Sequence, residues 1–166
     1  MRDYQRRTSL LFLALLIVPA AYAATAQTCP WLNAATAAGV LEGSVTVSVS
    51  YLDPDNRDAA CEFTYSADHT VRTLRIEVDT MKELSHDFPQ YIAKCGQDAK
   101  ALPAIGNEAF VCRIPGYDKQ VAEQVVSRIR ERVFIVGILS NGPVAERDAM
   151  RGKAIKIAEQ VAGFLF

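Results

Sequence analysis

The chain has 166 residues, with 18 basic and 19 acidic side chains and a formal net charge of −1. This length is typical of one domain, since domains commonly have about 100–200 residues. The near-neutral charge argues against nucleic acid or an anionic membrane surface as the partner, because such partners are bound through an excess of lysine and arginine.

The first 26 residues have the organisation of a secretory signal peptide. Three arginines lie within the first seven residues, and residues 10–18 form an uninterrupted apolar run. This run is about half of the roughly 20 residues needed to cross a bilayer. Small residues follow it, as at a signal-peptide cleavage site. We therefore expect cleavage after Ala23 or Ala26 and a secreted or periplasmic protein.

The expected mature chain, residues 27–166, forms a single domain without a membrane-spanning segment. The signal would remove three arginines and one aspartate, which leaves a net charge of −3. Domains of about 150 residues bury near 70% of their unfolded surface. The mature chain is therefore long enough to form a hydrophobic core.

All four cysteines, Cys29, Cys61, Cys95 and Cys112, lie in the expected mature chain. An even number in an oxidising compartment favours two disulfide bonds. Four cysteines allow three connectivities, and the sequence alone does not choose between them. We favour Cys29–Cys61 with Cys95–Cys112, because each pair then lies within one half of the chain.

Cys29 has a second interpretation, as the lipid-modified cysteine of a bacterial lipoprotein. A lipoprotein signal places a small residue directly before that cysteine, whereas Gln27 and Thr28 precede Cys29 here. Lipidation would also leave three cysteines, one of which would have no disulfide partner. A disulfide is therefore the better interpretation of Cys29.

The first half of the mature chain predicts a short helix and three strands. Asn33 is a suitable N-cap for a helix that Gly43 would end. Residues 44–52 alternate apolar and polar side chains without a break, which is typical of a half-buried strand. Residues 53–58 then form an acidic turn. Two further alternating segments follow, over residues 61–65 and 74–78.

The middle of the chain predicts a second helix and then a loop. Thr80 and Glu83 have capping-box spacing, and Gly96 would end the helix. Pro89 lies inside it, which predicts a kink or two short helices. Residues 101–108 are expected to form a loop.

The last part of the chain predicts three more strands and a third helix. Residues 108–114 form the fourth strand. Residues 120–132 fit either a helix or a strand, and their β-branched side chains favour a strand. Residues 133–139 are apolar on both faces, so this strand should be central and covered on both sides. The final helix, residues 150–165, is apolar along one side, and we expect the terminal Phe-Leu-Phe to dock on the core.

The resulting order, α-βββ-α-βββ-α, predicts an α+β domain. We expect an antiparallel sheet of about six strands with the helices packed on one face.

No motif of catalysis, cofactor binding or metal binding is found. His86 lies between Ser85 and Asp87, but neighbours along a helix point to different sides. The two histidines, His69 and His86, fall in different segments without a metal-binding spacing. The acidic turn lacks the glycine and glutamate of a calcium-binding loop. We therefore expect no catalytic residues, no cofactor, no metal and no enzymatic activity.

Arg128, Arg130 and Arg132 form an alternating basic row. Charged residues commonly protect the edges of sheets, so a polar edge or hairpin tip is the favoured interpretation. The same row is the candidate surface for an acidic partner.

Three segments of the chain resemble small bacterial secreted and lipoprotein domains of unknown function. They are CPWLNAATAAGVLEG at residues 29–43, CEFTY at 61–65 and LPAIGNEAFVC at 102–112. The resemblance extends to the ending IAEQVAGFLF. It implies an envelope location and an α+β sheet fold, and it implies no catalytic residues. Many such domains carry a lipoprotein signal before a lipidated cysteine, and this sequence departs from that signal.

Together these features predict an exported, non-catalytic binding or accessory module whose partner is an unidentified protein or small ligand. The alternative is a small-ligand or lipid carrier. A deep apolar pocket between helices and sheet would favour the carrier. An exposed apolar patch would favour the binding module.

Overall fold

The computed structural model describes residues 28–53, 55 and 58–166, so the expected signal peptide lies outside the described residues. The helices are α1 (Ala34–Leu41), α2 (Leu84–Ala93) and α3 (Arg147–Leu165). The strands are β1 (Thr46–Asp53), β2 (Asp58–Ala67), β3 (Thr70–Thr80), β4 (Lys100–Ala101), β5 (Glu108–Arg113), β6 (Val121–Ile129) and β7 (Arg132–Ser140).

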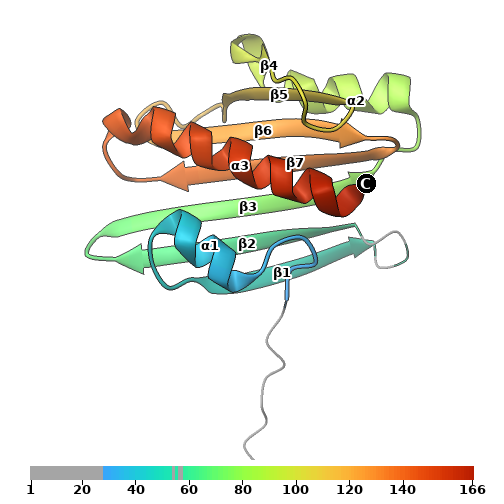
Figure 1. The fold of residues 1–166 in the computed structure, drawn as a ribbon. Helices are drawn as coiled ribbons and strands as arrows, with labels where there is room; N and C mark the ends of the chain where they lie inside the picture. The colour runs from blue at the N-terminus through green and yellow to red at the C-terminus, as the bar shows by residue number, and fades with distance from the viewer. Residues whose placement is uncertain (1–27, 54, 56–57) are drawn as a thin grey trace, which may run out of the picture.

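The strands form one sheet in the order β1-β2-β3-β7-β6-β5-β4, and all neighbours are antiparallel. The sheet therefore consists of two meanders that meet where β3 pairs with β7 (Figure 1). The α+β class and the antiparallel sheet are as predicted. The central position predicted for residues 133–139 is also confirmed, because β7 is the middle strand.

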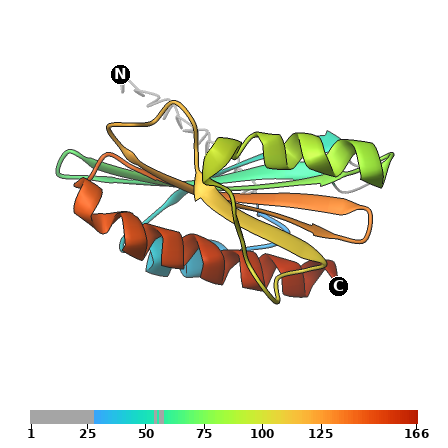
Figure 2. The same cartoon turned by 90° about the horizontal axis from the view of Figure 1, so that it is seen from above.

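The helices cover both faces of the sheet, so the prediction that they pack on one face is wrong. Helices α1 and α3 lie on one side and α2 lies on the other (Figure 2). The cause is that β6 and β7 are apolar on both sides. Val125 and Phe134 belong to the core beneath α1 and α3, whereas Val126 and Val133 pack in a second cluster with Phe88 of α2.

The sheet has seven strands rather than about six. The additional strand, β4, ends at Ala101, the first residue of the segment that was expected to be a loop. Lys100 and Ala101 pair with Val111 and Phe110 of β5 and form the edge of the sheet. A two-residue strand has too short a pattern to show alternation in the sequence.

The start of α2 also differs from the prediction. The helix runs through Pro89 as a single element, and the expected capping box is not formed. Instead, the carboxylate of Asp87 accepts hydrogen bonds from the backbone N–H groups of Lys82 and Glu83, each at 3.0 Å. A side chain inside the first turn thus satisfies the N–H groups that precede the helix.

Two disulfide bonds fasten outlying segments to the sheet. Cys29–Cys61 ties the segment before α1 to β2, and Cys95–Cys112 ties the end of α2 to β5. This is the connectivity favoured in the sequence analysis. Asn33 caps α1 as predicted, because its side-chain oxygen accepts the Thr36 N–H at 2.8 Å.

Helix α3 packs along β6 and β7 through a stripe of buried side chains at helical spacing. The stripe comprises Met150, Ala154, Ile157, Ala158, Val161 and Ala162. None of the helices within the described ranges combines the length and the apolar character that crossing a bilayer would require.

Candidate functional site

The arginine row lies at the tip of the β6–β7 hairpin, where two of its members are held by carboxylates. The Arg128 guanidinium lies 2.7 Å from a Glu108 carboxylate oxygen and also stacks over the ring of Phe88. Arg132 lies 3.3 Å from an oxygen of the buried Asp58. Arg130 forms the turn, is exposed, and pairs with none of the described carboxylates. The three charges therefore do not form one open basic surface.

The segment Gly106-Asn107-Glu108 fastens the loop after β4 to this hairpin. The Asn107 N–H donates to the Arg128 carbonyl oxygen at 2.8 Å, and the Arg130 N–H donates to the Asn107 side-chain oxygen at 2.7 Å. The Ser127 hydroxyl donates to the Glu108 carbonyl oxygen at 2.9 Å. These contacts give the segment a structural role in holding the hairpin.

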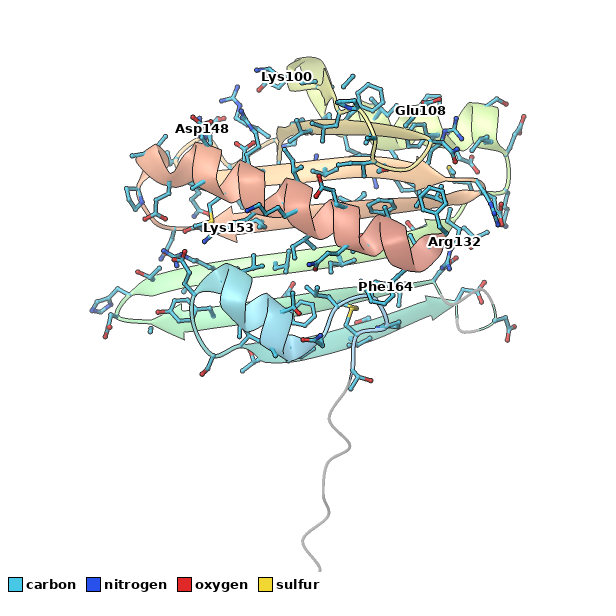
Figure 3. The ribbon with its side chains drawn as sticks, viewed as in Figure 1. Lys100, Glu108, Arg132, Asp148, Lys153 and Phe164 are labelled. Carbon is cyan, nitrogen blue, oxygen red and sulfur yellow. A yellow bond between two sulfur atoms is a disulfide. The ribbon has the colours of Figure 1, made fainter. Side chains whose placement is uncertain are left out.

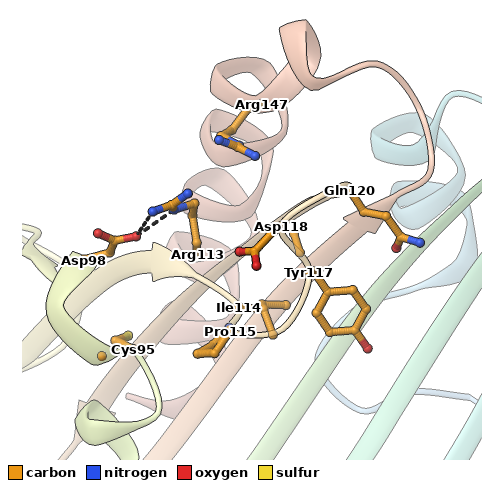
Figure 4. Close-up of a pocket in the computed structure, with 11 residues that line it drawn as sticks. Cys95, Asp98, Arg113, Ile114, Pro115, Tyr117, Asp118, Gln120 and Arg147 are labelled. Carbon is orange, nitrogen blue, oxygen red and sulfur yellow. Dashed lines mark hydrogen bonds and ion pairs between the residues drawn. The ribbon is translucent and has the colours of Figure 1, made fainter.

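A polar hollow of about 270 Å³ opens at the N-terminal end of α3 (Figure 4). Arg113 on its wall is paired with Asp98, and Arg147 of α3 lies across from it, with Asp118 and Tyr117 supplied by the loop after β5. Acidic and basic groups alternate around the wall. This balance gives the hollow no net preference for an anion or a cation.

A buried carboxylate lies next to the polar hollow, between two arginines of α3. Glu123 is 0% exposed, and its oxygens lie 2.8 Å from Arg151 Nε and 3.5 Å from Arg147 Nε. A buried charge needs such partners, because the interior does not solvate it. The triad thus connects β6 to the first turns of α3.

The histidine of the Ser-His-Asp sequence lies on the open surface of α2. The His86 side chain is 66% exposed, with Nδ1 at 3.0 Å from Asp87 and with Gln90 beside the ring. Hydrogen bonds from the Glu83 backbone and from His86 lower the pKa of Asp87. The carboxylate is therefore used to start the helix.

Asp79 and Tyr91 form a hydrogen-bonded pair of partly buried ionisable groups. The Tyr91 hydroxyl donates to an Asp79 carboxylate oxygen at 2.9 Å, beneath α2. Burial raises the pKa of Asp79, and burial together with the Asp79 carboxylate raises the pKa of Tyr91. Within the described part of the chain, no group of three or more metal-ligating side chains comes together.

An apolar groove lies between the start of α1, β1 and the end of α3. It consists of two adjoining hollows of about 400 and 340 Å³ that share Leu32 and Asn33. The first is also lined by Thr36, Gln160, Gly163 and Phe164, and the second by Thr28, Cys29, Ala34, Val47 and Phe63. None of these side chains is charged, and the amide and hydroxyl groups of Thr28, Asn33, Thr36 and Gln160 are the polar groups of this surface. We call this surface the apolar groove.

The exposed aromatic side chains of the described chain include Phe164, which lines the apolar groove, and Phe166. Phe164 is 67% exposed and Phe166 is 69% exposed. Figure 3 shows Phe164 at the end of α3, where it approaches the chain that leads into α1. The prediction that the terminal Phe-Leu-Phe docks on the core is thus wrong for the two phenylalanines, and only Leu165 packs against it. Phe164 lies seven residues after the buried Ile157, on the same side of α3, so it is exposed because it lies at the end of the helix.

No family model, curated protein or solved structure matches this chain. The apolar groove was not anticipated from the sequence. Two signals point to it in retrospect. Residues 28–41 contain no charged side chain, and residues 164–166 are two phenylalanines that flank one leucine. Exposed aromatic side chains next to uncharged hollows can bind an apolar surface by removing it from water.

Proposed function

We propose that the protein is an exported, non-catalytic binding module that holds an apolar surface of a partner in the apolar groove. The observation that carries the proposal is the exposure of Phe164 on the wall of an uncharged hollow, with a second exposed phenylalanine, Phe166, two residues further along the chain. Two large aromatic side chains left in water are costly unless a partner covers them, since burial of an aromatic side chain contributes about 1.5–3 kcal/mol. Aromatic side chains also dominate the energetics of interfaces.

Residues 1–26 support export, because they combine a basic start, a short apolar run and small residues at the expected cleavage site. The two disulfides are consistent with an oxidising compartment outside the cytoplasm. The resemblance to bacterial secreted and lipoprotein domains points to the same location.

The carrier hypothesis finds less support. It requires an apolar cleft between the helices and the sheet, and that space is filled with packed side chains such as Leu41, Phe63, Phe134 and Ile157. A small apolar ligand would have to bind in the surface hollows, whose volumes fall in the range of about 300–1,000 Å³ typical of ligand sites.

The proposal is tested with an apolar fluorescent dye, anilinonaphthalene sulfonate. The native protein is expected to enhance the dye fluorescence, and the double substitution Phe164→Ser and Phe166→Ser should remove most of that enhancement. Val144→Ser is the matched control, because Val144 is 49% exposed at the opposite end of α3. Equal enhancement by all three proteins would disprove the role of the groove.

A further inference from the structure

We infer that Asn141 is a site of spontaneous deamidation, and that hydrogen bonds to the β2–β3 hairpin and to Ser140 control the rate of this modification. The inference goes beyond the proposed function and does not depend on the apolar groove. It is carried by the residue that follows Asn141 in the sequence and by the bonds that hold its side chain.

The chemistry lies in the Asn141–Gly142 pair, the only Asn-Gly pair of the 166-residue sequence. In deamidation, the backbone nitrogen of the following residue loses its proton and attacks the side-chain carbonyl carbon of the asparagine. The new C–N bond closes a succinimide ring, and the side-chain nitrogen takes up a proton and leaves as ammonia. Water then opens the ring to aspartate or isoaspartate. Glycine favours the attack, because it has no Cβ atom to crowd the nitrogen and its backbone turns freely.

The side-chain amide of Asn141 is held at both of its polar atoms in the folded protein. Its oxygen accepts the Val71 N–H at 2.8 Å, and its nitrogen donates to the His69 carbonyl oxygen at 2.9 Å. The Asn141 backbone N–H also donates to the Val71 carbonyl oxygen at 3.2 Å. We call these three bonds the Asn141 clamp. They fix the position of the carbon atom that the Gly142 nitrogen attacks.

The attacking nitrogen is also engaged in a hydrogen bond. The Gly142 N–H donates to the hydroxyl oxygen of Ser140 at 3.0 Å, and Ser140 is buried. Ring closure requires the Gly142 nitrogen to lose its proton and to turn toward the Asn141 side chain, so this bond must break. The folded protein therefore reacts from a state in which both the Asn141 clamp and the Ser140 bond are open.

The Asn141 clamp lies where local opening is least costly. Asn141 directly follows β7 and meets the turn between β2 and β3 at one end of the sheet (Figure 1). Two residues of that turn, Asp68 and His69, are exposed and have positive φ values of 48° and 68°. This conformation is disfavoured for residues other than glycine, and such exposed segments open at a lower free energy than the core. Opening of the hairpin tip thus permits the reaction while the core stays folded.

The product differs from asparagine where the Asn141 clamp needs a donor. A carboxylate has no proton to donate to the His69 carbonyl oxygen, so two oxygens would face each other in place of the hydrogen bond. Deamidation should therefore loosen the contact between the end of β7 and the hairpin tip.

Peptide mass spectrometry of the purified full chain, incubated in mildly alkaline buffer with and without urea, tests the inference. In the unfolded chain we expect Asn141 to react faster than Asn33 and Asn107, which precede alanine and glutamate. In the folded protein Asn141 should react at least about tenfold more slowly than in the unfolded chain, because several hydrogen bonds must break first. Equal rates in the folded and unfolded protein would overturn the inference, as would an Asn141 that stays unmodified in urea.

Two serine variants test the control by hydrogen bonding. Ser140→Ala frees the Gly142 N–H and should raise the rate in the folded protein about fivefold, which corresponds to one hydrogen bond. Ser127→Ala is the matched control, because Ser127 of β6 is also buried but pairs with Phe134, toward the other end of β7. It should change the rate at Asn141 by less than about twofold, as expected for a distant site. Equal effects of the two variants would contradict the inference.

Discussion

A Cβ atom on Gly106 would lie 2.4 Å from the carbonyl oxygen of Arg128. Gly106 also has a φ of +63°, a conformation that side chains disfavour. The absence of a side chain lets the loop before β5 lie directly against the β6–β7 hairpin. Asn107 can then bond to the backbone of both Arg128 and Arg130.

Gly106→Ala should destabilise the fold by about 2–4 kcal/mol, because the added methyl group meets backbone that cannot move aside. Gly96→Ala is the control, since Gly96 has a similar φ of +61° but no neighbouring atom within 4 Å of its Cβ position. That variant should lose only about 1–2 kcal/mol. Urea unfolding measures both, and equal losses would mean that the close approach to Arg128 has no energetic importance.

Glu123→Ala should destabilise the protein by about 2–3 kcal/mol, because Arg147 and Arg151 would lose the carboxylate that neutralises them in a partly buried site. Asp148→Ala removes another carboxylate near Arg151, at 3.6 Å, but this one is 95% exposed. Its loss should cost less than about 0.5 kcal/mol. Thermal unfolding of the two variants compares a buried and an exposed partner of the same arginine. A small effect of Glu123→Ala would contradict the importance of the triad.

The Asp79 carboxyl should make stability depend on pH in the direction opposite to that of ordinary acid unfolding. Burial raises the pKa of Asp79 in the folded state, so the folded protein binds this proton more tightly than the unfolded chain does. The contribution of this proton to the free energy of unfolding is fully present below the pKa of Asp79 in the unfolded chain, which is about 3.9. It is lost as the pH rises through the pKa of Asp79 in the folded protein.

Asp79→Asn removes this titration while its side-chain oxygen can still accept the Tyr91 hydroxyl. The unfolding midpoint of the variant minus that of the native protein should therefore be larger at pH 7 than at pH 3. A difference that is constant with pH would show that Asp79 titrates alike in the folded and unfolded states.

The two disulfides predict a specific labelling pattern. Alkylation of the unfolded protein, purified under oxidising conditions, should add no label without a reductant and four labels after reduction, because all four cysteines are bonded. Loss of Cys29–Cys61 by double substitution to serine should cost about 3–4 kcal/mol, on a model in which the bond restricts the unfolded chain. Mass spectrometry measures the labels. Four labels without reductant would contradict both bonds.

Much of the fold is encoded locally and could be predicted from the sequence. Alternating side chains identified β1, β2 and β3, and the continuous apolar run of residues 133–139 identified the central strand. The side of the sheet on which each helix packs could not be predicted in this way. That choice depends on which face of β6 and β7 remains uncovered after α3 has packed, which is a property of the assembled sheet.

The candidate site was harder to predict than the fold. Arg128, Arg130 and Arg132 are conspicuous in the sequence, but their partners Glu108 and Asp58 lie on other strands and become neighbours only through the sheet register. The apolar groove joins residues from both ends of the described chain. Periodicity within one segment does not indicate such a surface.

The most direct test of the central claim is photo-crosslinking in the living host, with a benzophenone amino acid at Gln160 in the apolar groove. Gln90, exposed on α2 across the sheet, is the control position. We predict a discrete adduct from Gln160 and none from Gln90. The absence of an adduct at Gln160, or equal adducts at both positions, would contradict the assignment of the apolar groove as the binding site.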